Sequence, residues 1–494
     1  MNKWLTTLGM VLCLYMHGYA QEDNFENDFE SFRKSINEDF EDFRKKCNDE
    51  YASFLSNPWK QFEKEKPVPK PKEETVPPVI YPKDDLNIPV PEPKPLPYKD
   101  VIRVPDIKPQ PVPIEPLEDV PNPVDVERVK FQWFGTDMHV RYNLSNALKL
   151  RGTKEQNIAD AWKEMSSDDV YTNLAYDCLQ LRTEYGLCDW AYFTMLKAMS
   201  DALCGKESNE ATLLMAYIFC QSGYKMRLAR DGSGKLHILY ASQHVIFGQP
   251  YYTLGGEFFY PYNIDATRLY ICDQAFPGEQ SLSLLISGNP NLSEAMTSAR
   301  TRKSDKYPDV RVTFKSNKNL MDFYSIYPTS MIGDNMVSRW AMYANTPISE
   351  NMKSQIYNDL KRAISNCNQL KAVNKLLNFV QTGFTYEYDD KVWGGDRAFF
   401  AEESLYYPYC DCEDRSILFT RLVRDLLGLR CILIYYPGHL ASAVELTQHS
   451  GDVGDYILLG NRKFTIADAT YINAPVGMTM PGMDNKTAKV ILLE

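Results

Sequence analysis

The spacing of apolar positions along the chain predicts a mixed α+β protein. Helical patterns dominate from about residue 128 to about 225, and the run TLLMAYIFCQSG is apolar around most of its circumference, as in a buried helix. Short strand-like stretches follow, including LHILYA and YYTLGGEFFYPYN, in which Gly255-Gly256 marks a hairpin turn. Residues 266–345 mix strand-like pieces such as SLSLLIS and DVRVTF with loops, and helical patterns resume near residue 346.

The last part of the chain combines one long helix with two pairs of strands. In EDRSILFTRLVRDLLGL the apolar residues recur at helical spacing, and Gly428 is a typical C-terminal stop. The stretch RCILIYYPGHLASAVEL predicts two strands around Pro437-Gly438, and YILLGNRKFTIADAT predicts a hairpin around Gly460-Asn461. The expected fold of this part is a helix packed on an antiparallel sheet.

The first 20 residues have the pattern of a cleaved secretory signal. They carry one lysine and an apolar centre, and Gly18-Tyr19-Ala20 precedes Gln21. We therefore expect an exported protein that is periplasmic, extracellular or on the cell surface. An uncleaved signal anchor and a lipid anchor on Cys13 are the alternatives, and Leu12 disfavours the second because it stands where a small residue is needed. No later stretch is long and apolar enough to span a membrane.

Aromatic residues recur every eleven positions within residues 21–65. One series is Phe29, Phe40, Tyr51 and Phe62, and a second series is Phe32, Phe43 and Phe54. Eleven residues make three helical turns, so these side chains form a stripe on an amphipathic helix, which Pro58 breaks or kinks. Residues 25–62 are therefore expected to pack against a partner helix or to self-associate.

A proline-rich segment over residues 66–127 separates this helix from the rest. Residues 67–123 hold 18 of the 30 prolines, in runs such as KPVPKPKEE and PVPEPKPLP. Such a composition favours extended polyproline II and builds no core. We expect a spacer that holds the globular part away from the helix, with a ligand for a proline-binding domain as the alternative.

Composition and charge narrow the function classes. The chain has 494 residues, 44% of them hydrophobic, which is enough for two or three packed domains. A formal net charge of −11 argues against a nucleic-acid partner and offers no basic patch for an anionic membrane surface. The cysteines are scattered, without the spacing of a disulfide framework, and no cofactor is expected.

Three residues have the order and setting of a cysteine-based catalytic triad. Cys412 stands at the start of the predicted helix, His439 opens a predicted strand and Asp468 ends another. In such a triad histidine removes the thiol proton, and the carboxylate fixes the histidine tautomer and stabilises the imidazolium. The Cys412 N–H would supply one oxyanion donor, with Tyr386 or Trp393 as candidates for the second.

The segments CEDRSILFTRLVRDLLGL, YYPGHLASAV and FTIADATY resemble the transglutaminase-like cysteine hydrolase superfamily over roughly residues 346–494. The resemblance implies a papain-like α+β fold, with Cys412 as nucleophile, His439 as general base and acid, and Asp468 as the residue that orients the histidine. Two features depart from the family pattern. The start CEDRS is more acidic, and Ala441-Ser442-Ala443 follow His439 where an aromatic residue is often present.

Other interpretations of Cys410 and Cys412 compete with the triad. A zinc site needs two further ligands and no second cysteine pair lies nearby, so no metal ligand is assigned. A disulfide between the two would close a strained small loop, and a redox pair is the remaining alternative. Cys410 is therefore expected to be a bystander. Glu413 and Asp414 suit the N-terminal end of a helix but oppose a thiolate beside them, so the thiol requires a base.

An offset of 205 residues aligns the earlier helix–hairpin unit with the later one and predicts a duplicated core. The offset puts Glu207 at the position of Cys412, Asn263 at that of Asp468, and Gly234, or His237 after a three-residue gap, at that of His439. The earlier copy would lack a nucleophile and serve in packing or substrate binding. Chance similarity of two unrelated units is the alternative.

These patterns divide the chain into six parts. They are a signal peptide (1–20), an amphipathic helical segment (21–65), a proline-rich linker (66–127), a degenerate transglutaminase-like domain (128–270), a connecting region with strands (271–345) and a transglutaminase-like catalytic domain (346–494).

The expected function is that of an exported cysteine enzyme that cleaves or transfers amide bonds of peptides or proteins through a thioester on Cys412. Hydrolysis is favoured because nothing in the sequence marks an acyl-acceptor site. The competing hypothesis is a non-catalytic periplasmic or surface protein that keeps the fold and uses both copies as a binding platform.

Overall fold

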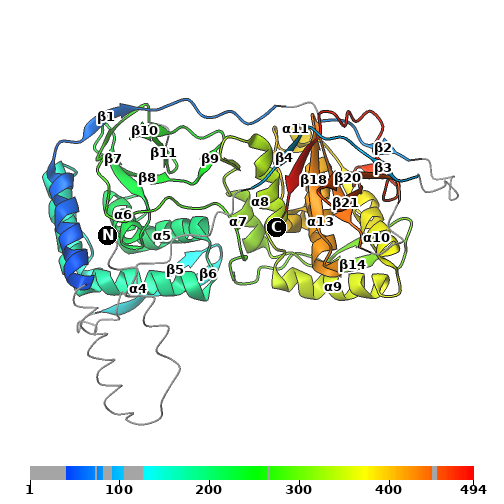
Figure 1. Ribbon diagram of the computed structural model, residues 1–494. Coiled ribbons are helices and arrows are strands. Elements are labelled where there is room, and N and C mark those ends of the chain that lie inside the picture. The colour runs from blue at the N-terminus through cyan, green and yellow to red at the C-terminus, as the bar shows by residue number, and fades with distance from the viewer. Residues whose placement is uncertain are drawn as a thin grey trace, which may run out of the picture.

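The computed structural model of the protein describes residues 40–72, 75–81, 92–104, 126–264, 266–447 and 453–493. These residues form two α+β units side by side, each with a curled, mainly antiparallel sheet and helices packed on it (Figure 1). The mixed α+β class predicted from the periodicity is confirmed. The expected signal segment and the aromatic residues Phe29 and Phe32 lie outside the described residues.

The N-terminal unit holds the first sheet, with strands in the order β1-β12-β7-β8-β11-β10. Its strands are β1 (Lys60–Glu63), β7 (Met226–Arg230), β8 (Leu236–Ala241), β10 (Tyr252–Leu254), β11 (Glu257–Pro261) and β12 (Arg268–Ile271). Its helices are α3 (Glu155–Ser167), α4 (Asp169–Glu184), α5 (Asp189–Cys204) and α6 (Asn209–Gln221). Helix α6 is apolar on nearly every side because it packs between α5 and the strands β7 and β8.

The C-terminal unit holds the second sheet, in the order β3-β20-β21-β19-β18-β23-β4. Its strands are β3 (Lys94–Pro95), β4 (Asp100–Ile102), β18 (Cys431–Tyr436), β19 (His439–Glu445), β20 (Asp455–Leu459), β21 (Arg462–Ile466) and β23 (Lys489–Leu492). Its helices are α9 (Glu350–Ile364), α10 (Gln369–Thr382), α11 (Asp389–Val392), α12 (Ala401–Tyr406) and α13 (Cys412–Leu427). Helix α13 packs on β18 and β19, and Gly428 ends it in the left-handed region with φ 64°.

The two sheets place their strands in a corresponding order. The series β12-β7-β8-β11-β10 in the first sheet corresponds to β23-β18-β19-β21-β20 in the second, and every neighbouring pair in both series is antiparallel. The outer strands differ, because β1 runs antiparallel to β12 whereas β4 runs parallel to β23. The predicted turns are confirmed: Gly255-Gly256 joins β10 to β11, Pro437-Gly438 joins β18 to β19, and Gly460-Asn461 joins β20 to β21.

Several short elements connect the units. They are β9 (His244–Ile246) paired with β15 (Ser330–Ile332), β13 (Arg300–Lys303) paired with β14 (Arg311–Phe314), the helices α7 (Lys318–Ser325) and α8 (Arg339–Asn345), and the single turn η2 (Met336–Ser338); a further single turn, η1 (Leu144–Asn146), lies between β6 and α3 in the N-terminal unit. The stretch DVRVTF thus contains a strand, as predicted, whereas SLSLLIS makes only one bridge, between Ser242 and Leu282. Tyr324 of α7 stacks on Phe400 at 4.5 Å between ring centroids, so one hydrophobic core runs through both units.

The helical pattern predicted from about residue 128 was wrong for residues 127–142. These residues form a hairpin of β5 (Glu127–Trp133) and β6 (Thr136–Tyr142) around Phe134-Gly135. Alternate side chains, among them Phe131, Trp133, Met138 and Val140, are buried, which is the period-two pattern of a half-buried strand.

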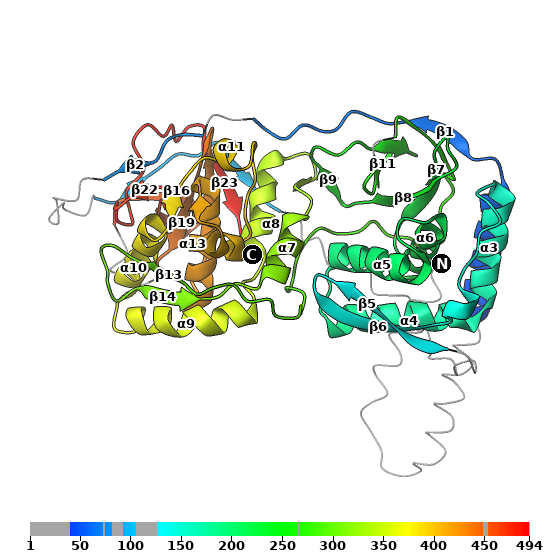
Figure 2. The ribbon, with the colours of Figure 1, turned by 180° about the vertical axis from the view of Figure 1, so that it is seen from behind.

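The spacer expected over residues 66–127 is contradicted where the structure describes it. The segment after β1 crosses from the N-terminal unit to the C-terminal unit along one edge of the molecule (Figure 1). There β2 (Val79–Ile80) pairs with β22 (Tyr471–Ile472), β3 pairs with β20, and β4 pairs with β23. Figure 2, seen from behind, shows α4 and α9 at the opposite edge of the molecule. Proline is tolerated here because edge strands leave one side of the backbone unpaired.

The aromatic helix packs on its own chain rather than standing apart. Residues 40–56 are helical, and the helix ends just before Pro58, as predicted. Tyr51 is buried against Trp162 and Phe276, whereas Phe43 of the second aromatic series is 57% exposed. Asn48 donates to Gln221 and accepts from Trp162, so polar contacts also fix the helix on the N-terminal unit.

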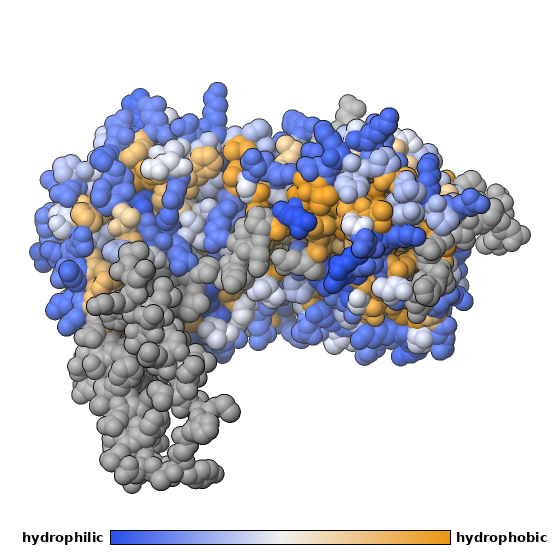
Figure 3. Space-filling view, in the orientation of Figure 1, coloured by the Kyte–Doolittle hydropathy of each residue, from blue (hydrophilic) through white to orange (hydrophobic). Residues whose placement is uncertain are grey.

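The surface of the molecule carries some exposed hydrophobic side chains. Hydrophobic side chains gather on the visible face of the C-terminal unit, while the outline of the molecule is mostly hydrophilic (Figure 3). Exposed large apolar residues include Ile80 of β2 and Leu458 of β20. Within the described residues, every helix is too short or too polar to cross a bilayer.

Candidate active site

Cys412 occupies the first turn of α13, in contact with strand β19. The backbone N–H of Asp411, just before the helix, donates to Asp414 Oδ2 at 3.3 Å. Cys412 is buried, its Sγ donates to Glu413 Oε2 at 3.1 Å, and the backbone N–H of Leu440 in β19 is near enough to lower the pKa of the thiol. The thiol therefore lies beside the residue that directly follows His439.

His439 and Asp468 form a buried hydrogen-bonded pair. His439 opens β19, and its Nε2 lies 2.9 Å from Asp468 Oδ2. Asp468 lies two residues beyond β21, where its Oδ1 accepts the N–H groups of Thr470 at 2.8 Å and Tyr471 at 3.3 Å. Because Asp468 holds Nε2, Nδ1 is left as the basic nitrogen of a neutral ring. Among the described residues, Nδ1 has no hydrogen-bond partner.

The structure brings the candidate nucleophile and base to one cavity. Cys412 and His439 both line a space of about 610 Å³, whose other walls include Trp340 and Asp389. Lys70 of the N-terminal segment forms a further part of the wall. The backbone N–H of Val76 donates to Gly438 O at 2.8 Å, which holds this segment next to His439.

The thiol lies in an acidic, poorly hydrated setting. Burial, and then the carboxylates of Glu413 and Asp411, raise the pKa of Cys412 well above its ordinary value. The N–H of Leu440 acts in the opposite direction but is the weaker influence. The resting thiol is therefore neutral, and any nucleophilic role requires a base that removes its proton during attack.

Five carboxylates surround the start of α13. Asp389, Asp396 and Glu413 approach within 4.8 Å of one another, as do Asp389, Asp411 and Asp414. Burial and mutual repulsion raise the pKa of Asp411 and of Asp414 well above the ordinary range. Burial followed by Glu413 likewise raises the pKa of Asp389. These oxygen atoms are the groups near the thiol that could hold a metal ion.

The structure places the two oxyanion candidates, Tyr386 and Trp393, differently, and neither is among the residues that line the thiol cavity. Tyr386 lies in β16 (Thr385–Tyr386), which pairs in parallel with β17 (Tyr409–Cys410) just before the nucleophile. The charge of a Cys412 thiolate would act on the Tyr386 hydroxyl, which is buried and has no hydrogen-bond partner among the described residues. Trp393 instead lines a neighbouring pocket.

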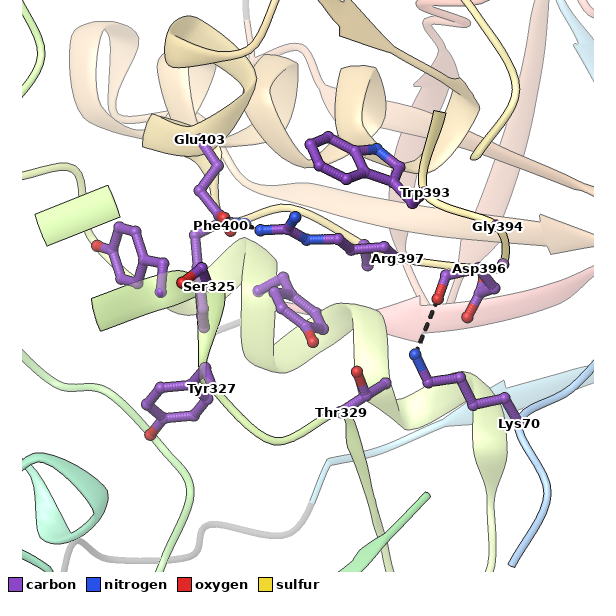
Figure 4. A pocket seen from close by; sticks show the side chains of 14 residues that line it. Lys70, Ser325, Tyr327, Thr329, Trp393, Gly394, Asp396, Arg397, Phe400 and Glu403 are labelled. Carbon is purple, nitrogen blue, oxygen red and sulfur yellow. Dashed lines mark hydrogen bonds and ion pairs between the residues drawn. The ribbon is translucent and has the colours of Figure 1, made fainter. Parts of the chain in front are cut away.

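That neighbouring pocket, shown in Figure 4, is rich in aromatic side chains and lies between the connecting region and the C-terminal unit. It measures about 510 Å³ and shares Lys70, Gly394, Gly395 and Asp396 with the thiol cavity. Lys70 Nζ donates to the Asp396 carbonyl at 3.0 Å, and Arg397 pairs with Glu403 at 2.9 Å. The two spaces therefore meet at the loop that contains the two glycines.

Cys410 has a separate environment from Cys412. It is buried, with its Sγ 3.9 Å from the Thr385 carbonyl oxygen. The cysteines of the described residues, Cys410 and Cys412 among them, are free thiols.

The N-terminal unit carries other residues where the C-terminal unit has Cys412, His439 and Asp468. At the start of the helix, the alignment of the two units differs by two residues from the offset of 205. Helix α6 begins at Asn209, whose Oδ1 accepts the N–H of Leu236 at 2.8 Å, and helix α13 begins at Cys412, where the N–H of Leu440 lowers the pKa of the thiol. By contact, the counterpart of Cys412 is therefore Asn209, and Glu207 is an exposed residue with φ 57°. His237 pairs with Asp231 of the turn between β7 and β8 at 3.0 Å, rather than with Asn263 after β11.

Sequence patterns indicated the three triad residues but not Asp389 and Asp396. The only signal for them was the recurrence of acidic residues in the stretch DDKVWGGD, and such a stretch is equally typical of a solvated loop.

Comparison of the chain with protein-family models, characterised proteins and solved structures finds no match.

Proposed function

We propose that the protein is an exported cysteine enzyme that cleaves amide bonds of peptides or proteins at Cys412. The observation that carries this proposal is the orientation of His439. Its Nε2 is held by Asp468 at 2.9 Å, while Nδ1 is left without a partner among the described residues at the cavity that Cys412 also lines. That is the tautomer needed for a histidine that accepts a thiol proton.

The chemistry proceeds from a neutral thiol. As Cys412 Sγ attacks the amide carbon, His439 Nδ1 takes the thiol proton, and Asp468 stabilises the imidazolium that forms. The Cys412 N–H and the Tyr386 hydroxyl donate to the oxyanion of the tetrahedral intermediate. His439 then protonates the leaving amine, and water, activated by the same histidine, hydrolyses the thioester.

The neighbouring pocket supports a substrate larger than a single amino acid. It shares four lining residues with the thiol cavity and is rich in aromatic side chains, which bind apolar groups of a peptide. A peptide bound at the thiol would extend across Gly394-Gly395 into this pocket. The N-terminal segment at Lys70 forms part of both walls and would contact such a peptide.

The matching strand order of the two sheets supports a duplicated, transglutaminase-like core in which the N-terminal unit has lost the chemistry. Asn209 takes the place of the nucleophile, and an asparagine side chain cannot form a thioester. The N-terminal unit would then serve in packing, and the wall of the pocket opposite the C-terminal unit comes from the connecting region, to which Tyr327 belongs.

A non-catalytic binding protein is the second candidate, and the acidic setting of Cys412 favours it. The thiol donates to Glu413 rather than to His439 Nδ1, and its pKa is raised by burial and by the two neighbouring carboxylates. In such a protein the cavity would bind a ligand without turnover.

Peptide-library cleavage distinguishes the two candidates. The wild-type chain is expected to cleave a subset of peptides, Cys412→Ala to cleave none, and Asn209→Ala, the matched change in the N-terminal unit, to retain activity. If the wild type and Cys412→Ala both bind library peptides and neither cleaves them, the enzyme proposal is contradicted and the binding protein is supported.

A further inference from the structure

The hairpin of β13 and β14 concentrates positive charge in a chain whose net charge is −11. Residues 298–315 contain two acidic and six basic residues, and the basic ones are Arg300, Arg302, Lys303, Lys306, Arg311 and Lys315. Within the described residues none of these six forms an ion pair, and one of the two acids, Asp309, is held by Lys375 of α10. The positive charge of the hairpin is therefore not balanced by its own surroundings.

Two of these cations lie opposite each other across the hairpin. Lys303 of β13 pairs in register with Arg311 of β14, and both residues are exposed. Like charges directly opposite each other destabilise a sheet. In the hairpin of β5 and β6, Arg128 also lies opposite an arginine, but that residue, Arg141, forms an ion pair with Asp177 at 2.7 Å. No acid has this role at Lys303 and Arg311 in the described part of the chain.

A third cation lies under β13 with only neutral partners. Arg302 is partly buried, donates to the Tyr407 carbonyl at 3.1 Å and lies 5.0 Å from the centre of the Phe384 ring. Its Nε is buried without a hydrogen-bond partner among the described residues. The charge of Arg302 therefore adds to that of the exposed face instead of neutralising an acid beneath it.

A groove of about 320 Å³ lies between this hairpin and α9, which runs beside β14 (Figure 2). Both acids that line the groove are already paired, Asp359 with Arg362 at 3.1 Å and Asp309 with Lys375. Arg311 also lines the groove, and it has no ion pair within the described residues. The groove therefore presents a guanidinium group that is available to an anionic ligand.

We propose that the exposed face of β13 and β14, with the adjoining groove, is a docking surface for an acidic segment of another polypeptide. Carboxylate side chains complement Lys303 and Arg311, and a guanidinium binds a carboxylate in a bidentate manner. Side chains two positions apart share a face of a strand, so Thr301 and Thr313, whose hydroxyls are 2.8 Å apart, lie beside the two cations. These hydroxyls can bond the backbone of the docked segment.

A short acidic segment fits this surface better than a nucleic acid or an anionic membrane does. The last two present negative charge over a wide area, and the rest of this acidic chain would repel them. An acidic peptide needs only the local patch and the groove beside it.

The surface belongs to the same unit as Cys412. Arg302 contacts the carbonyl of Tyr407, in the segment that leads to β17 and Cys412. In the proposed enzyme the surface would select protein substrates that carry an acidic segment away from the scissile bond, a role that rests on the proposed function. Docking itself needs no cleavage, so it can be measured in Cys412→Ala.

Fluorescence anisotropy of a labelled glutamate decapeptide, titrated with the full-length Cys412→Ala chain at low ionic strength, tests the surface. Saturable binding is expected, and it should weaken by about tenfold or more in about 0.5 M salt because exposed charges are screened. Adding Arg311→Glu should weaken binding by about fivefold or more. Arg128→Glu is the matched control, an exposed arginine on the β5–β6 hairpin, and should change affinity by less than about twofold.

Thermal unfolding separates loss of the surface from loss of the fold. Arg311→Glu should melt at or above the temperature of its parent, because it replaces a like-charge pair with an opposite-charge pair at Lys303. If Arg311→Glu melts well below its parent, Lys303→Gln provides the same test with a smaller change.

Several results would overturn the proposal. They are the absence of saturable binding in the parent chain, equal affinity in Arg311→Glu and Arg128→Glu, and tighter binding of a single-stranded oligonucleotide than of the decapeptide. A wild-type dimer in analytical ultracentrifugation that Arg311→Glu dissociates would assign the surface to a second copy of the chain instead.

The failure of docking and the failure of catalysis give different results. If Cys412→Ala binds the decapeptide and the wild type cleaves no peptide, the docking surface is upheld and the enzyme is contradicted. If the wild type cleaves peptides and Cys412→Ala does not bind the decapeptide, the docking surface alone is contradicted.

Discussion

The two units place a polar side chain at the same junction of helix and strand, but the chemistry of that side chain differs. In the N-terminal unit Asn209 opens α6 and accepts the N–H of Leu236, and in the C-terminal unit Cys412 opens α13, where the N–H of Leu440 lowers the pKa of its thiol. The asparagine completes a structural hydrogen bond, whereas the cysteine places the proposed nucleophile at the same junction. A common framework of helix and strands therefore does not determine activity.

Buried acids show the same contrast. In the N-terminal unit Asp189 is fully engaged, by Arg182 at 2.8 Å, by the Tyr224 hydroxyl at 2.7 Å and by the Ser283 N–H at 2.8 Å. In the C-terminal unit Asp411 Oδ1 has no partner within the described part of the chain. Satisfied acids stabilise a fold, and unsatisfied acids at a cavity indicate ligand binding or chemistry.

The largest expected effect comes from the histidine pairs of the two units. His439→Ala should reduce kcat/KM for peptide cleavage by about 10³-fold or more, because it removes the group that takes the thiol proton and then protonates the leaving amine. His237→Ala, which removes the pair with Asp231, should leave cleavage unchanged. Steady-state kinetics on one peptide substrate measures both, and equal losses in the two variants would show that the histidines have only a structural role.

Matched core truncations test whether the two helices support their sheets equally. Leu213 in α6 and Leu418 in α13 are both fully buried leucines, so alanine at either should lower the free energy of unfolding by about 2–5 kcal/mol. Urea unfolding monitored by fluorescence provides the comparison. A cost at Leu213 below about 1 kcal/mol would mean that α6 is not a core helix of the kind that α13 is.

A smaller effect is expected at the oxyanion position. Tyr386→Phe should lower kcat by about 10- to 100-fold with little change in KM, because it removes a donor used only in the transition state. Folding stability should not fall, since the lost hydroxyl is buried without a partner. Trp393→Phe is the control and should affect KM more than kcat, and the reverse pattern would assign the second donor to Trp393.

The smallest expected effect is a pH dependence of local stability. Burial raises the pKa of Glu402 and of Glu403 in α12 to about 7, from an ordinary value of 4.5. Between pH 4.5 and about pH 7 the folded state therefore binds more protons than the unfolded state. The free energy of unfolding falls as the pH rises through this range and is regained on acidification.

Hydrogen exchange can compare this dependence between the units. In α5, burial raises the pKa of Asp189 to about 6. The pH dependence of stability in α5 therefore comes from one acid, and its pKa is lower than those of Glu402 and Glu403. After correction for intrinsic rates, protection in α12 should rise more than protection in α5 when the pH is lowered from 8 to 6. Equal changes in the two helices would contradict the attribution to Glu402 and Glu403.

The features predicted correctly from the sequence were local ones. Helical spacing identified α6 and α13, and glycine-containing pairs such as Gly255-Gly256 and Gly460-Asn461 identified the turns, because side-chain period and positive φ act within a few residues. The hairpin of residues 127–142 was missed although its alternation is equally local. The tight turn at Phe134-Gly135 was the signal that could have found it.

The features that the sequence did not reveal depend on contacts between distant segments. A proline-rich composition predicts an extended chain but not which sheet edge it joins, so the pairing of β3 with β20 and of β4 with β23 could not be read from it. Asp389 and Asp411 are likewise brought together only by the fold, and the pairing of β16 with β17 contributes to that approach. Side-chain tautomers, such as that of His439, follow from such contacts as well.

Labelling of the thiols in the full-length chain by a peptide-like electrophile tests the central claim most directly. If Cys412 is a nucleophile activated by His439, mass spectrometry should find rapid modification at Cys412, none at Cys410, which does not line the cavity, and a rate at Cys412 lowered by about 10²-fold or more in His439→Ala. Slow labelling of Cys412 at the same rate in the wild type and in His439→Ala would contradict the claim.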